Sequence, residues 1–133
     1  MTPFPLKIVT PDGPEFEGMV EELIVRTIEG DMGILAGHVN CVAPLGMGQA
    51  MVLAEGKRRY AACIGGMVSV VDGAVTLVPT TFEWAENIDQ ARAERSAANA
   101  KTVIDSKDST DAEIQLAQAR LKRALIRKSV AGR

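Results

Sequence analysis

The stretch ENIDQARAERSAANA, residues 86–100, decides the fold because the pattern of the chain changes within it. Alanine has the highest helix propensity of all residues, and it recurs at five positions between residues 88 and 104. Asp89 stands at the start of this segment, and aspartate is a good helix cap. We therefore predict a helix over residues 88–104 and a domain boundary after residue 86.

Residues 1–86 are predicted to form an antiparallel β-sandwich. Segments such as LKIVT, residues 6–10, alternate apolar and polar side chains, which is typical of half-buried strands. Turn signals follow roughly every ten residues, a spacing typical of sandwiches and barrels. Glu55-Gly56-Lys57 and Asp72-Gly73 are expected to be hairpin turns, because Asp-Gly supplies the positive φ angles that tight turns need.

Residues 87–133 are predicted to form an α-helical hairpin. A polar break at residues 105–109 follows the first helix, and Thr110 with Glu113 fits a capping box that opens a second helix. The second helix is expected to end near Ser129. Two helices joined by so short a loop pack against each other as an antiparallel pair.

Two stripes of side chains run along the predicted second helix. The apolar stripe is expected to face the first helix, and the basic stripe lies beside it. Because the first helix has few large apolar residues, the contact should bury little area, so we expect a weakly held hairpin that can move. The apolar stripe is Ile114, Ala117, Leu121 and Leu125, and the basic stripe is Arg120, Arg123 and Arg127.

Composition excludes several classes of protein. With 47% hydrophobic and 24% charged residues and no apolar run of membrane-spanning length, the chain is typical of a soluble globular protein. The N-terminus lacks the basic start and apolar run of a signal peptide, so the cytoplasm is the expected compartment. A single histidine rules out a metal site built from several imidazoles. Cys41 and Cys63 are expected to be reduced core thiols.

Charge is divided unevenly along the chain. Residues 1–87 carry a net charge of −6 and residues 88–133 a net charge of +4, and six basic residues follow Ala119 with no acidic one. This asymmetry predicts a partner or an anion at the C-terminal end. Nucleic acid is not expected there, because no aromatic side chain is interleaved with the basic ones to offer a stacking platform.

The segment GDMGILAGH, residues 30–38, has three glycines but not the spacing of a phosphate-binding loop. We interpret it as a tight loop between strands, in which glycine supplies positive φ angles. Met32, Ile34 and Leu35 give this turn-rich segment an apolar character that suits a protein contact. His38 has no partner in the sequence pattern that would make it a catalytic base.

Asp89 and Arg92 allow two interpretations. Asp89 can be a helix cap with a solvated arginine nearby, or the two residues can begin a ligand site. A ligand site requires more cations, and a folded hairpin would bring Arg123 and Arg127 back beside the first helix. Three guanidiniums could then surround a polyphosphate, while Glu83 and Asp89 accept from an adenine amino group or a ribose hydroxyl.

Five fragments of the chain together resemble the epsilon subunits of bacterial F-type ATP synthases. They follow one another in the expected order and at the expected intervals over nearly the whole length. The fragments are IVTPDGPEFEG, GDMGILAGH followed by APL, CIGGMVSVVDGAVTLV, IDQARA and LKRALIRKSVA. The resemblance implies a β-sandwich followed by a helical hairpin, in agreement with the pattern of the sequence.

The resemblance also implies a non-catalytic subunit at the foot of the rotating central stalk of a proton-translocating ATP synthase. Such a subunit is peripheral to the cytoplasmic face of the cell membrane and is not inserted into it. Residues 1–86 would bind the gamma subunit and the ring of c subunits. Asp31, Met32 and His38 would lie on the side of that ring.

The hairpin, residues 87–133, would be the regulatory domain. In the family it can extend into the catalytic head and inhibit ATP hydrolysis, with its basic residues against an acidic segment of the beta subunit. The matching charges are Arg120, Lys122, Arg123, Arg127 and Lys128.

Some members of the family bind ATP on the folded hairpin through an I/L-D-x-x-R-A motif and arginines of the second helix. The residues implied are Glu83, Ile88, Asp89, Arg92, Ala93, Arg123 and Arg127. Strong binders can carry another arginine where this chain has Asn99, so a weaker affinity is expected. ATP, with or without Mg²⁺, would be a regulatory ligand, and neither an obligatory cofactor nor a catalytic residue is implied.

A free-standing adaptor is the alternative function. Its β-sandwich would act without a larger complex, and its basic helical tail would bind nucleotide or acidic partners. An enzyme of a β-barrel class is disfavoured, because the sequence has one histidine and no cluster of acids, bases or metal ligands.

Overall fold

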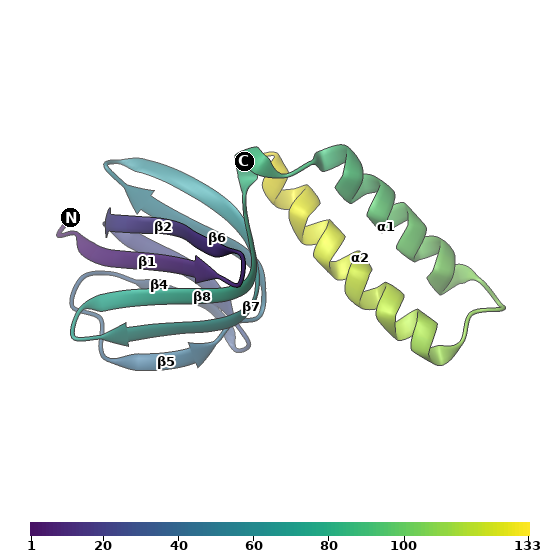
Figure 1. The fold of residues 1–133 in the computed structure, drawn as a ribbon, viewed down its shortest axis with the longest axis horizontal. Coiled ribbons are helices and arrows are strands. Elements are labelled where there is room, and N and C mark those ends of the chain that lie inside the picture. Colours follow the sequence, from purple (N-terminus) through teal and green to yellow (C-terminus); the bar gives the residue numbers. More distant parts are fainter. The chain divides into compact units, whose positions relative to one another are not determined.

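Eight strands occupy the first part of the chain and two α-helices the last part, in the order that the sequence predicts (Figure 1). The computed structural model describes residues 1–133 and divides them into two units, Met1–Trp84 and Ala85–Arg133, which we call the β unit and the helical unit. The strands are β1 (Phe4–Thr10), β2 (Gly13–Val20), β3 (Glu22–Thr27), β4 (Gly30–Ile34), β5 (Cys41–Pro44), β6 (Met47–Ala54), β7 (Lys57–Val71) and β8 (Ala74–Trp84). A short 3₁₀ helix, η1 (Ala85–Asn87), precedes α1 (Gln90–Asp105) and α2 (Asp111–Ala131).

The strands form one mixed sheet in the order β2-β1-β8-β7-β6-β3-β4, with β5 paired to β7. The predicted fold class, a β-sandwich followed by a helical hairpin, is confirmed. One pair differs from the antiparallel arrangement expected, because β1 and β8 run parallel, with Leu6 opposite Val75. Hairpin signals concern strands that follow each other, whereas β1 and β8 lie at opposite ends of the β unit in the sequence.

Both predicted hairpin turns form where expected. Glu55 and Gly56 join β6 to β7 with φ angles of 51° and 75°, and Asp72 and Gly73 join β7 to β8 with φ angles of 49° and 83°. Positive φ at both central residues is typical of the type I′ turn, whose twist matches that of the strands it joins. These two turns make β6, β7 and β8 direct neighbours in the sheet.

Strand β7 changes its partner along its length. Its first part pairs with β6 and its last part with β5, while β8 follows it on the other side. Gly65 and Gly66 lie at the change, with φ angles of 69° and 98°. A Cβ atom on Gly66 would clash with the carbonyl oxygen of Val78, so glycine is required there.

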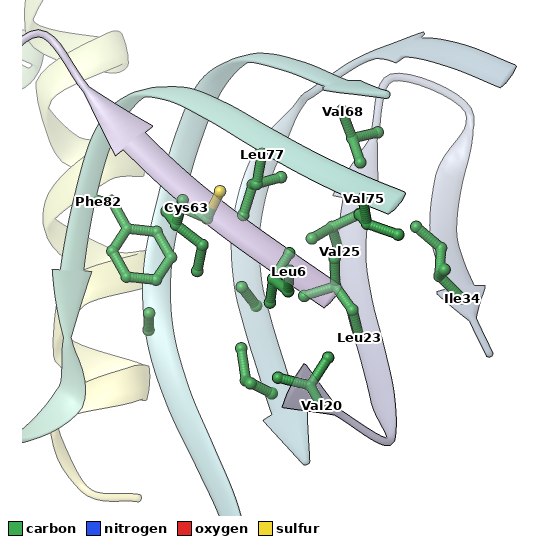
Figure 2. Close-up of a cluster of buried hydrophobic side chains, with 14 of the residues drawn as sticks. Leu6, Val20, Leu23, Val25, Ile34, Cys63, Val68, Val75, Leu77 and Phe82 are labelled. Carbon is green, nitrogen blue, oxygen red and sulfur yellow. The ribbon is translucent and has the colours of Figure 1, made fainter. Parts of the chain in front are cut away.

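The core of the β unit is filled by alternate side chains of several strands. Figure 2 shows Leu6 of β1, Val25 of β3 and Leu77 of β8 in the same cluster, and all three are fully buried. Cys63 lies in this cluster, and burial raises the pKa of its thiol to about 12. Cys41 is half-buried against the core, and both thiols are free, as predicted.

The glycine-rich segment is less of a loop than expected. Gly30–Ile34 is strand β4, which pairs with β3, so only residues 35–40 connect it to β5. The expectation of a loop over residues 30–38 is therefore wrong for its first five residues. Glycines disfavour strands in isolation, but hydrogen bonds to β3 and burial of Ile34 override that preference here.

The caps of both helices form as predicted. The Asp89 side chain accepts a hydrogen bond from the backbone N–H of Arg92 at 3.0 Å and so begins α1. In the capping box of α2, the Glu113 N–H donates to the Thr110 hydroxyl at 3.1 Å, and the Thr110 N–H donates to the Glu113 carboxylate at 3.2 Å. Neither helix has the length and apolar content needed to cross a membrane.

The contact between α1 and α2 is built mainly from alanine. The buried residues of the two helices are Ala93, Ala97 and Ala100 on α1 and Ala117, Ala124 and Val130 on α2. Of the predicted apolar stripe, Ala117 is buried, Ile114 and Leu121 are half-buried, and Leu125 is 45% exposed, so the stripe is not buried along its whole length. Ala124 takes the inward position because small side chains let the helix backbones approach closely.

Candidate functional site

The start of α1 places Asp89 and Arg92 in different roles. The Asp89 carboxylate uses one oxygen to cap the helix, which leaves its second oxygen to accept from a ligand. The Arg92 side chain is exposed and makes no hydrogen bond or ion pair within the chain. The cap interpretation is therefore confirmed for Asp89, and it does not account for Arg92.

The end of α2 returns beside the start of α1. The two helices pack as an antiparallel pair, and α2 also contacts η1, which directly precedes α1 (Figure 1). Arg123 and Arg127, half-buried on the last part of α2, therefore lie on the section of the hairpin that also holds Arg92. A polyphosphate site on the hairpin would need guanidiniums from both helices near one anion.

Two further residues of the predicted ATP set lie in the helical unit, and one does not. Ile88 is half-buried just before the cap, and Ala93 is buried in the contact between α1 and α2. Glu83 is half-buried on β8 opposite Ala62, within the β unit. Its part in a nucleotide site stays a prediction.

A groove of about 380 Å³ lies between α1 and α2 and was not predicted from the sequence. Ser96 and Asn99 of α1 and Glu113 and Arg120 of α2 supply its polar lining. A sequence pattern contains no direct signal for such a groove, because its lining comes from two helices whose relative rotation depends on how they pack.

The basic residues assigned to the beta subunit all lie on α2, and Arg120 among them also lines the groove. Arg120, Lys122 and Lys128 are all exposed. Of these residues only Lys128 lies in the last turn of α2, where a cation interacts favourably with the helix dipole.

The residues assigned to the c-ring side occupy two neighbouring segments of the β unit. Asp31 lies on β4 and forms an ion pair with Arg26 of β3 at 2.6 Å, which raises the pKa of the arginine. Met32 follows on β4 but is half-buried against the core. The His38 ring lies in the loop after β4, with its Nδ1 atom 2.9 Å from the carbonyl oxygen of Val39.

Exposed apolar side chains surround these segments, and the sequence pattern identified only one of them. Ile34, proposed as part of an apolar surface, is buried in the core, whereas Leu35 is exposed. Ile28, Val39 and Val42 are between 63% and 74% exposed and come from the β3–β4 turn, the loop after β4 and strand β5. Exposed apolar residues that gather in this way are typical of a protein contact.

Comparison with known proteins identifies the family. Residues 3–85 match the family model described as the beta-sandwich domain of the ATP synthase delta/epsilon chain. The "ATP synthase epsilon chain" of Ruminococcus albus is 40% identical over 134 residues, which cover 100% of this chain and 99% of that protein. The chain belongs to the ATP synthase epsilon chain family. That of Bacillus subtilis is also 40% identical, over 96% of both chains.

Chains in two solved structures have the same fold as this chain. A chain in a structure of the Euglena gracilis mitochondrial ATP synthase, titled as OSCP/F1/c-ring, matches 93% of this chain and 78% of its own length. Its TM-score is 0.82 and its sequence identity is 27%. A chain in the Tetrahymena thermophila central stalk and c-ring structure has the same fold, with a TM-score of 0.61 at 14% identity.

Membership of the epsilon chain family fixes the general role. An epsilon chain is a non-catalytic subunit of the ATP synthase and takes part in ATP synthesis. The resemblance noted from the sequence and the expectation of a non-catalytic chain are thereby confirmed. A match over the whole length also favours a subunit of the ATP synthase over a free-standing adaptor.

Proposed function

We propose that this chain couples the catalytic head to the c ring of a proton-translocating ATP synthase and also regulates ATP hydrolysis. The subunit lies at the cytoplasmic face of the cell membrane without entering it. Its β unit binds the gamma subunit and the c ring. Likeness to chains in structures whose titles name F1, the c ring and the central stalk supports these partners.

The c-ring contact is assigned to the segments that carry Asp31, Met32 and His38. Their support is the exposed apolar surface beside them, formed by residues such as Ile28 and Val39. Co-purification of the chain with the gamma subunit and with c rings tests the assembly role. Failure to bind the gamma subunit would contradict it and would favour the adaptor.

The helical unit acts as a mobile brake on ATP hydrolysis. The observation that carries this proposal is the contact of α1 with α2, in which five of the six buried residues are alanines. At roughly 25 cal/mol per Å² of buried apolar area, small side chains hold the folded hairpin weakly. Elements of low stability are the ones that move between two arrangements. In the extended form, the stripe of Arg120, Lys122, Arg123, Arg127 and Lys128 contacts the acidic segment of the beta subunit.

ATP is the ligand that keeps the brake folded. Asp89 and Arg92 at the start of α1 and Arg123 and Arg127 near the end of α2 bind it, with Ile88 and Ala93 against the base. A ligand that binds only the folded form, at ten times its dissociation constant, stabilises that form by about 1.4 kcal/mol. For a weakly held hairpin, that changes the ratio of folded to extended forms about tenfold.

Calorimetric titration of the full-length chain with ATP, with and without Mg²⁺, tests the sensor. We expect saturable binding of one nucleotide per chain. An absence of heat at millimolar ATP would contradict nucleotide sensing, and it would leave the assembly role to the co-purification experiment.

A further inference from the structure

Half of the residues that line the groove between α1 and α2 are apolar, and three of the others carry side-chain hydrogen-bond donors. The side chains of Ser96, Asn99 and Arg120 line it, and none of them makes a hydrogen bond or ion pair within the chain. Glu113 is the one acidic residue of the lining, and its carboxylate accepts from the Thr110 N–H in the capping box. A hydroxyl, an amide and a guanidinium around one hollow suit an anion with several oxygens.

The groove continues the proposed nucleotide site along the hairpin. On α1, Arg92, Ser96 and Asn99 are spaced by four and three residues, so they share one face of the helix. On α2, Arg120 and Arg127 are seven residues apart and likewise share a face. Seven residues of helix rise about 10 Å, and because the helices are antiparallel, both steps lead from the proposed site towards the same part of the groove.

We propose that the groove holds the terminal phosphate of ATP and that Arg120 is the residue that distinguishes ATP from ADP. This inference rests on the proposed nucleotide site. With the base and ribose near Asp89, the phosphate chain runs along the shared faces past Arg92. The γ-phosphate then reaches Arg120, with Asn99 and Ser96 as neutral donors. ADP ends one phosphate earlier and leaves this guanidinium unbound.

The assignment gives Arg120 two partners that exclude each other. A guanidinium whose forked donors hold a phosphate has no donors left for a carboxylate of the beta subunit. ATP would therefore stabilise the folded hairpin and also withhold a cation from the brake, and ADP would not withhold it.

The test is titration of the full-length chain with MgATP and with MgADP, in the wild type and in Arg120→Ala. A charge-assisted bond to phosphate is worth about a factor of ten in affinity, so Arg120→Ala should weaken ATP binding about tenfold. Its affinity for ADP should stay as in the wild type. Arg120→Lys should recover part of the loss, because it keeps the charge but not the forked donors.

Lys101→Ala is the matched control. It removes one positive charge from an exposed position on α1 that does not line the groove. Alanine is a strong helix former, so circular dichroism should show unchanged helicity in both variants. If Arg120→Ala weakens ATP and ADP binding equally, or weakens neither, the assignment of Arg120 is wrong while the nucleotide site stands. If the wild type binds no ATP, both proposals are wrong.

Discussion

The guanidinium of Arg59 stacks on the ring of Trp84, with its central carbon 3.7 Å from the ring centroid. Trp84 is the only tryptophan of the chain and the last residue of the β unit, and the rings of Phe16 and Phe82 meet it edge to face. The aromatic cluster and the guanidinium of Arg59 therefore anchor the end of β8. The helical unit begins directly after this point. This gives the chain a single tryptophan as a fluorescent reporter near the junction of its two units.

Arg59→Ala should uncover Trp84 and destabilise the β unit. Loss of the cation–π contact should lower the free energy of unfolding by about 1 kcal/mol and shift the tryptophan emission to longer wavelength. Denaturant unfolding followed by fluorescence measures both effects. Arg58→Ala is the control, because it removes a neighbouring exposed charge from β7. Equal effects of the two variants would mean that the stacking contributes nothing.

Asp89→Ser should separate the cap from the ligand site. Serine caps a helix about as well as aspartate, so the helicity of the chain should not change. The lost carboxylate should weaken ATP binding about tenfold, as for other hydrogen bonds to charged groups. Asp89→Ala should lower both the affinity and the stability of α1, the latter by about 1 kcal/mol. Wild-type affinity in Asp89→Ser would show that Asp89 is only a cap.

Arg92→Ala and Arg123→Ala should each weaken ATP binding about tenfold in calorimetric titrations. The two residues lie on different helices, so equal losses would show that one ligand touches both. Lys101→Ala again serves as the charge control and should bind as the wild type does. Unchanged affinity for ATP in both arginine variants would mean that Arg92 is only a solvated residue next to the helix cap.

A chain that ends after Glu86 should fold, assemble and fail to inhibit. It keeps the whole β unit and its core, so it should bind the gamma subunit with wild-type affinity. Without the helical unit, the reconstituted complex should hydrolyse ATP faster than one that contains the full chain. If the shortened chain inhibits as strongly as the full one, the hairpin is not the brake.

The two thiols should react at very different rates. Because burial raises the pKa of Cys63, the folded state keeps this thiol in its neutral form. The contribution of the buried neutral thiol to stability is therefore present below the ordinary thiol pKa of about 9. That contribution should be lost as the pH rises from about 9 towards 12, because the thiol of Cys63 ionises easily only in the unfolded chain over this range.

At neutral pH a thiol reagent should label half-buried Cys41 first and Cys63 only on unfolding. Equal labelling rates would contradict the buried position.

Local patterns in the sequence were sufficient for the two hairpin turns and the caps of both helices. The turn at Asp72 and Gly73 and the caps at Asp89 and Thr110 depend on backbone angles and hydrogen bonds within four residues of each position. Such interactions are nearly independent of the rest of the fold, so they can be predicted from a short window. The change from strands to helices, which lies between Trp84 and Gln90, is of the same kind.

Tertiary structure decided what depends on distant residues. No local pattern relates β1 to β8, which pair in parallel, or shows where β7 changes its partner. The stacking of Arg59 on Trp84 is likewise a contact between distant residues. The rotation of α2 about its axis buries Ala124 and exposes Leu125. The small alanine side chain lets the two helix backbones approach closely, whereas the larger leucine in its place would hold them apart. That same rotation brought Asn99 and Arg120 to one groove, so this part of the site was visible only after the helices were packed.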